Sequence, residues 1–157
     1  MTQTTSRIID RLLLEYGNSH QNEINKAVHW VCVPAIVWAI TALLWSLPST
    51  FGIWYINWAT IFLTISLVYY IVLSPALAVG FAVCGVICVH LIIIYEASWV
   101  LPLWQFALSV FVLAWIAQFW GHQIEGKKPS FLKDVQFLMI GPAWLMSFIY
   151  RSWGIRY

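Results

Sequence analysis

The segment from Ala27 to Ile124 carries a single formally charged side chain, that of Glu96. Charged residues make up only 9% of the chain, against about 25% in an ordinary soluble domain, while 62% of the residues are hydrophobic. A soluble fold of 157 residues buries about 70% of its unfolded surface, so it would leave much apolar surface in water. The composition therefore predicts one integral-membrane domain over residues 1–157. The net charge of +2 gives no indication of nucleic-acid binding.

Four apolar segments are long enough to cross a lipid bilayer, because a crossing of about 30 Å takes about 20 helical residues. We expect these segments at residues 28–47, 53–73, 76–95 and 101–121, in an all-α bundle. Turn residues separate them, such as Pro48 with Gly52, and Ser74 with Pro75. The short connections predict that consecutive helices are antiparallel.

Two further helices are predicted outside the crossing segments. Residues 4–16 place apolar side chains on one helical face and charged side chains mostly opposite. This pattern indicates an N-terminal amphipathic helix that rests on the membrane surface or on the bundle. A fifth apolar stretch at 135–150 is short for a crossing and is interrupted by Gly141 and Pro142. We interpret it as an interfacial or re-entrant helix.

Basic residues lie only before the first crossing segment and after the fourth. They are Arg7, Arg11, Lys26, Lys127, Lys128, Lys133, Arg151 and Arg156. With four crossings, both groups lie on the same side of the membrane, and the positive-inside rule places both termini in the cytoplasm. The membrane would be a bacterial inner membrane or the endoplasmic reticulum.

Two polar clusters flank the apolar block, and in each the spacing places the members on one helical face. The members are Asn22, Asn25 and His29 at the first edge, and Gln118, His122 and Glu125 at the second. In a four-crossing bundle the two edges lie at the same membrane depth. Because unpaired polar groups near hydrocarbon are costly, we expect the two clusters to meet.

Three imidazoles and one carboxylate at these edges form a candidate metal site, made of His20, His29, His122 and Glu125. Neutral imidazole binds zinc, iron, copper or nickel, and two histidines with one carboxylate favour ferrous iron and oxygen chemistry. The amides of Asn22, Asn25 and Gln118 are candidates for fixing the tautomers of the rings. The sequence contains no Walker loop, dinucleotide fingerprint or zinc HExxH motif.

Each of these residues also has a purely structural interpretation. His20 and His29 could hydrogen-bond lipid headgroups and water, since their spacing has little specificity for metal. His122 could cap the C-terminal end of its helix, where a cation is favoured, and Glu125 could be a solvated charge beside lysines. His90 lies well along the third crossing segment, and we interpret it as a buried packing or hydrogen-bonding residue.

The two clusters resemble the sequence signatures of the Mpo1-like family. The first signature is matched by Tyr16, His20, Asn22, Asn25, His29, Val33 and Pro34, and the second by Gln118, Phe119, Gly121, His122, Glu125 and Pro129. The resemblance covers nearly the whole chain. It implies an Fe(II)-dependent dioxygenase that uses O2 to shorten 2-hydroxy fatty acids by one carbon, in the degradation of long-chain bases. It also implies that His20, His29 and His122 bind the metal.

Under this resemblance, the acyl chain of the substrate lies among the crossing helices and its carboxylate reaches the cytoplasmic interface. We expect Lys26, Lys127 or Lys128 to attract that carboxylate. Membrane hydroxylases and desaturases with two irons need more than the four histidines present here. The alternative from another class is a non-catalytic lipid-binding or scaffold protein in which the histidines are structural. A transporter is disfavoured, because no charged residue lies in the middle of a crossing segment.

Overall fold

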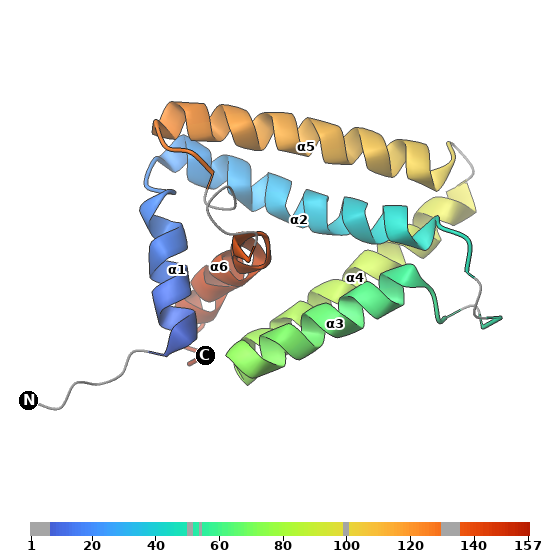
Figure 1. Ribbon diagram of the computed structural model, residues 1–157, viewed down its shortest axis with the longest axis horizontal. Helices are drawn as coiled ribbons and strands as arrows, with labels where there is room; N and C mark the ends of the chain where they lie inside the picture. Colours follow the sequence, from blue (N-terminus) through green and yellow to red (C-terminus); the bar gives the residue numbers. More distant parts are fainter. Residues whose placement is uncertain (1–6, 50–51, 54, 99–100, 130–135) are drawn as a thin grey trace, which may run out of the picture.

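The computed structural model describes residues 7–49, 52–53, 55–98, 101–129 and 136–157, and these residues form helices without any strand. The helices are α1 (Ile8–Asn18), α2 (Glu23–Trp45), α3 (Trp58–Leu73), α4 (Pro75–Ser98), α5 (Leu103–Glu125) and α6 (Phe137–Ser152) (Figure 1). The predicted all-α class is confirmed.

Three helices, α2, α4 and α5, are long and apolar enough to cross a membrane. They correspond to the first, third and fourth predicted crossings, although α2 already begins at Glu23 and α5 continues to Glu125. The second predicted crossing is represented by α3, which begins at Trp58 and has 16 residues. At about 1.5 Å per residue, α3 is about 24 Å long, less than the hydrocarbon core. Residue 54 of that predicted crossing lies outside the described ranges.

Two antiparallel helix pairs form the body of the molecule. α2 packs along α5, and α3 packs along α4. Figure 1 shows the pairs meeting at one end and separating toward the other, where α1 and α6 lie between them. α6 contacts α1, α2 and α4, so it joins the N-terminal helix to both pairs.

α1 is the amphipathic helix that the sequence predicts. The structure describes the chain from Arg7 onward, and the helix begins at Ile8. Ile9, Leu13 and Tyr16 lie at helical spacing and are buried. Residues 4–6 of the predicted helix lie outside the described ranges. The buried face of α1 packs on α6 and so fixes where the chain enters the turn before α2.

α6 packs within the bundle, and half of its residues are buried. The Tyr70 hydroxyl of α3 donates to the carbonyl of Met139 at 2.5 Å, and the Tyr150 hydroxyl of α6 donates to the carbonyl of Ala76 at 2.6 Å. A Cβ at Gly80 would lie 2.7 Å from the sulfur of Met146, so α4 and α6 approach closely there. These contacts explain why a stretch too short to cross a membrane still forms an ordered helix.

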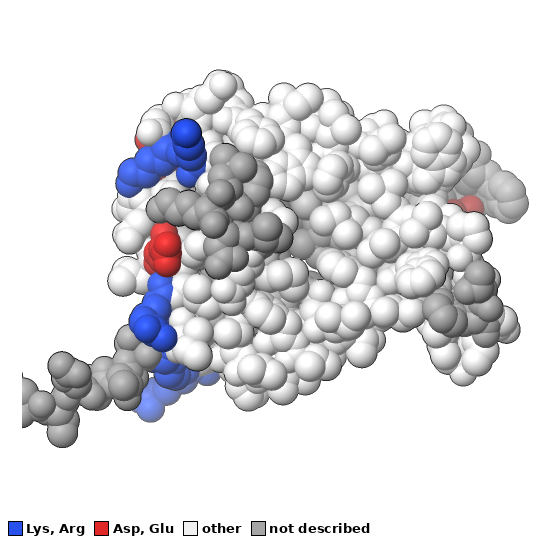
Figure 2. Space-filling model, in the orientation of Figure 1, with Lys and Arg blue, Asp and Glu red and all other residues white. Residues whose placement is uncertain are grey.

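Apart from the carboxylate of Glu96 near the end of α4, the charged side chains in this view gather at one end of the body (Figure 2). The lysines and arginines visible in this view lie at this end, as the crossing order predicts, whereas Lys133 lies outside the described ranges. Large apolar side chains such as Val72, Val86 and Leu113 are exposed along the body. A body of this kind is compatible with a membrane protein.

His90 is exposed, so the prediction that this histidine is buried is wrong. The buried face of α4 includes Cys88 and Ile92, each two positions from His90. Two helical positions correspond to about 200°, which turns the imidazole away from that face.

Candidate metal centre and its cavity

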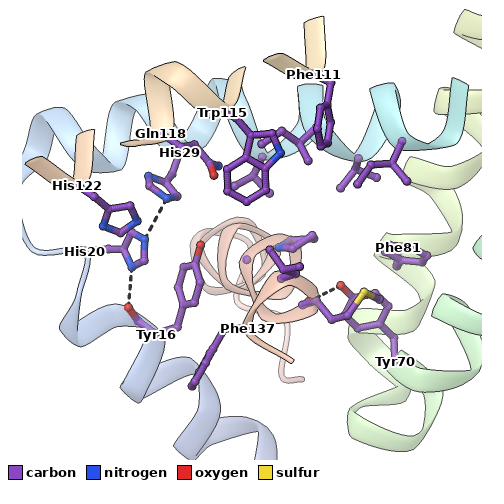
Figure 3. Close-up of a pocket in the computed structure, with 18 of the residues that line it drawn as sticks. Tyr16, His20, His29, Tyr70, Phe81, Phe111, Trp115, Gln118, His122 and Phe137 are labelled. Atoms are coloured by element: carbon purple, nitrogen blue, oxygen red, sulfur yellow. Dashed lines mark hydrogen bonds between the residues drawn. The ribbon is translucent and has the colours of Figure 1, made fainter. Parts of the chain in front are cut away.

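Three helix ends bring His20, His29 and His122 together (Figure 3). His20 follows the end of α1, His29 lies near the start of α2, and His122 lies in the last turn of α5. The three side chains are only 1%, 1% and 6% exposed. One ligand atom from each ring lies within 4.8 Å of the other two. The two polar edges therefore meet, as the crossing order predicts.

Backbone carbonyls fix the tautomers of two of the rings. The Nδ1 of His20 lies 2.7 Å from the carbonyl oxygen of Tyr16, and the Nδ1 of His29 lies 2.9 Å from that of Asn25. Because a carbonyl oxygen can only accept a hydrogen bond, each Nδ1 carries the ring proton. Both Nε2 atoms of the neutral rings are then unprotonated, and they lie 3.0 Å apart. Two lone pairs this close repel each other unless a proton or a metal ion lies between them.

A metal ion fits between these nitrogens better than a proton. Burial and the neighbouring His29 lower the pKa of His20 to about 3, which disfavours a shared proton at neutral pH. Two nitrogens bound to one ion at about 2.1 Å and about 90° lie about 3.0 Å apart. The Nδ1 of His122 is also buried and has no hydrogen-bond partner among the described residues. The donor set therefore fits a metal ion.

Two aromatic rings support His20. Tyr16 stacks on its imidazole with the centroids 4.1 Å apart and the planes at 11°, and the centroid of Trp144 lies 5.2 Å away. Sequence reasoning gave neither aromatic residue a role in the site. The spacing of Tyr16 and His20, one helical turn apart, is the signal that could have found the stacked pair.

Glu125 lies outside the group of ligand atoms and holds the turn that carries His20. One carboxylate oxygen accepts from the backbone N–H of Gln21 at 2.9 Å, and the other accepts from that of Asn22 at 2.8 Å. The second oxygen also accepts from the side-chain amide of Asn25 at 3.2 Å. The carboxylate thus sits at the N-terminus of α2, where an anion is favoured. It fastens the start of α2 to the end of α5.

The amides predicted to fix the tautomers have other roles. The side chain of Asn22 caps α2 by accepting from the backbone N–H groups of Ile24 and Asn25. Asn25 is fully buried against Gly121, where an added Cβ would lie 2.6 Å from the amide oxygen. The tautomers of His20 and His29 are set by carbonyls instead, since each ring folds back onto the carbonyl four residues earlier.

Two of the lysines predicted to attract a substrate carboxylate have other partners. Lys26 pairs with Glu23 at 3.0 Å, and the ammonium of Lys127 donates to the carbonyl of Asn18 at 2.6 Å. Lys128 is exposed. Among the described residues that line the apolar cavity beside the three histidines, none is a lysine, although Lys26 and His20 both line a separate polar cavity.

That cavity has a volume of about 270 Å³ and is mostly apolar (Figure 3). The histidines lie at one end, and Tyr70 and Phe81, with ring centroids 4.4 Å apart, lie at the other. The same two rings also line a second apolar cavity of about 240 Å³, between α2, α4 and α6. The two rings therefore form part of a partition between the cavities.

The family described as 2-hydroxy-palmitic acid dioxygenase Mpo1-like matches residues 7–153. The chain belongs to the Mpo1-like family. The resemblance of the two sequence signatures is thus confirmed, and the Mpo1-like match includes all six helices and the three histidines. Comparison with curated proteins and with solved structures found no match. The family's description points to dioxygenase activity.

Proposed function

We propose that this Mpo1-like protein is an Fe(II)-dependent membrane dioxygenase that shortens 2-hydroxy fatty acids by one carbon. The description of its family supports the substrate class and the reaction type. The observation that carries the proposal is the pair of unprotonated Nε2 atoms of His20 and His29, 3.0 Å apart beside His122. These atoms lie at the end of an apolar cavity rather than in an open polar cleft.

The three histidines would hold the iron, and the bound ion would supply the activation of O2. The residues of the chain do the remaining work. The carbonyls of Tyr16 and Asn25 keep the proton of each ring on Nδ1, so that the Nε2 lone pairs of His20 and His29 stay available. Glu125 keeps the turn before α2 against α5, which maintains the distance between His20 and His122.

The apolar cavity would hold the acyl chain of the substrate. Its walls are largely aromatic and aliphatic, and each methylene group that leaves water contributes about 0.8 kcal/mol to binding. Because the histidines lie at one end of the cavity (Figure 3), the ligand would bind with its carboxylate and 2-hydroxyl toward the rings and its tail toward Phe81. The enclosed walls would also keep bulk water from the reacting carbons.

We further propose that the charged end of the molecule faces the cytoplasm. The lysines and arginines visible in Figure 2 lie at that end, and the start of α1 and the C-terminus lie on the same side in Figure 1. The positive-inside rule then gives the orientation. A 2-hydroxy fatty acid dissolved in the membrane would have its polar head at the depth of the histidines.

The test is iron retention and product formation by the purified protein. With Fe(II), O2 and 2-hydroxypalmitate, we expect the wild-type protein to form the product one carbon shorter. His29→Ala and His122→Ala should lose both iron and product, whereas His90→Ala, altered at an exposed histidine of α4, should keep both. A folded wild-type protein that binds no iron and leaves 2-hydroxypalmitate unchanged would favour the scaffold alternative.

A further inference from the structure

Two polar side chains reach into the apolar cavity beside the histidines, those of Tyr16 and Gln118 (Figure 3). They are only 7% and 8% exposed. Within the described ranges, the structure gives neither the hydroxyl of Tyr16 nor the amide of Gln118 a hydrogen-bond partner. Both are thus buried polar groups that face the space a ligand would occupy.

Such groups are costly unless something in the cavity pairs with them. Leaving a buried donor or acceptor unpaired costs about 1–3 kcal/mol. The phenol can donate one hydrogen bond, and the amide can both donate and accept. A phenol has an ordinary pKa of about 10, so it keeps its proton at neutral pH and remains a donor. The pair therefore suits a ligand with a carboxylate and a hydroxyl group.

The two side chains flank the histidine cluster. Gln118 lies one helical turn before His122 on the same face of α5. Tyr16 stacks on His20, and its hydroxyl oxygen would lie 3.0 Å from a Cβ added at Gly141. The missing side chain at Gly141 leaves room for the phenol between α1 and α6. A ligand head at the rings would thus lie near both polar groups.

We propose that Tyr16 and Gln118 are positioning residues that hydrogen-bond the carboxylate and the 2-hydroxyl of the fatty acid, and so select 2-hydroxy acids over unsubstituted ones. The inference rests on the proposed function. A site built to pair with a ligand hydroxyl rejects the analogue that lacks it, because its own polar groups are then left unpaired. In this proposal, two neutral side chains bind the carboxylate of the ligand, instead of the lysines that the sequence suggested.

The test compares the affinities of metal-free, full-length protein in detergent for 2-hydroxypalmitate and for palmitate. Tyr16→Phe and Gln118→Leu remove the polar groups and nearly preserve side-chain volume. We expect each variant to bind 2-hydroxypalmitate about tenfold more weakly, which corresponds to one lost hydrogen bond, with a smaller change for palmitate. Phe111→Leu alters an apolar part of the same wall and should weaken both ligands equally.

Three results would overturn the inference. One is a wild-type preference for 2-hydroxypalmitate that survives in both variants. Another is a wild-type protein that binds the two acids equally. The third is unchanged selectivity in Tyr16→Phe together with weaker binding of Fe(II) when the ion is added back, which would make Tyr16 only a support for His20. If Tyr16→Phe does not fold, the Gln118 variant decides alone. Selective binding by an iron-loaded protein that forms no product would refute the proposed function while leaving the selectivity inference intact.

Discussion

Replacing Glu125 with alanine should weaken both the fold and the retention of metal, although Glu125 is not among the ligand atoms. The carboxylate accepts three hydrogen bonds, two from backbone N–H groups of the turn before α2 and one from Asn25. A hydrogen bond to a charged group contributes about 1.5–3 kcal/mol when buried. Because this carboxylate is only half-buried, we take about 1 kcal/mol for each bond. The free energy of unfolding should therefore fall by about 3 kcal/mol.

The effect on metal follows from the place of His20 in the same turn. Without the carboxylate, Gln21 is no longer fastened to α5, and the imidazole of His20 loses its fixed distance to His122. Loss of a supporting partner of this kind costs about 10–100-fold in metal affinity. Thermal unfolding in detergent and competition with a coloured chelator would measure the two effects.

Glu23→Ala is the matched control for this prediction. Glu23 is also a carboxylate at the start of α2, but its side chain is 88% exposed and pairs only with Lys26 among the described residues. An exposed pair contributes about 0–1 kcal/mol, so this variant should behave almost like the wild type. If Glu125→Ala were no less stable than Glu23→Ala and kept iron equally well, the role assigned to the carboxylate would be refuted.

Three further predictions concern the cavity, the helix contact and the pH response. Phe81→Ala should open the partition between the two apolar cavities and shift the preferred 2-hydroxy acid to longer chains. Binding affinities measured for a series of 2-hydroxy acids of increasing chain length test this shift. An unchanged preference would contradict the proposed position of the tail. Gly121→Ala should place its Cβ 2.6 Å from the buried amide oxygen of Asn25 and destabilise the protein by about 1–3 kcal/mol. The melting temperature of the variant should therefore be lower. A melting temperature equal to that of the wild type would contradict this close contact. For metal-free protein, the unfolded chain binds a proton at His20 near pH 6.5 whereas the folded chain resists until about pH 3. As the pH is lowered from 6.5, this histidine should therefore reduce the free energy of unfolding by about 1.4 kcal/mol per pH unit. Denaturant unfolding between pH 7 and 5 measures this slope. The free energy of unfolding of His20→Ala should depend less on pH than that of the wild type.

The helical architecture could be predicted because long apolar runs leave few alternatives to membrane helices. The start of the second predicted crossing was misplaced, since hydropathy alone extended it upstream to residue 53. A capping box formed by Asn57 and Thr60 starts α3 at Trp58 instead. The Asn-x-x-Thr pattern is present in the sequence, but hydropathy does not detect the hydrogen bonds of a helix cap.

The histidine cluster could be predicted because the crossing order alone brings residues about a hundred positions apart to one depth. The partners of those histidines could not be predicted, because they depend on the directions of side chains in the turn between α1 and α2. The expectation for Lys127 used only its charge, whereas the folded chain places its ammonium on the carbonyl of Asn18, at the C-terminal end of α1. The orientation of Gln118 into the cavity likewise follows from how α5 is rotated against α2.

If the three rings hold iron as proposed, their placement would make iron loading part of folding as well as of chemistry. His20 and His29 belong to the N-terminal quarter of the chain, while His122 comes from the far end of α5. An ion bound by all three would act as a removable cross-link between distant parts of the chain. Because it would bind the folded state alone, a hundredfold excess over its dissociation constant would add about 2.7 kcal/mol of stability. Cells short of iron would then hold a more easily unfolded protein, and its abundance would follow the supply of the metal.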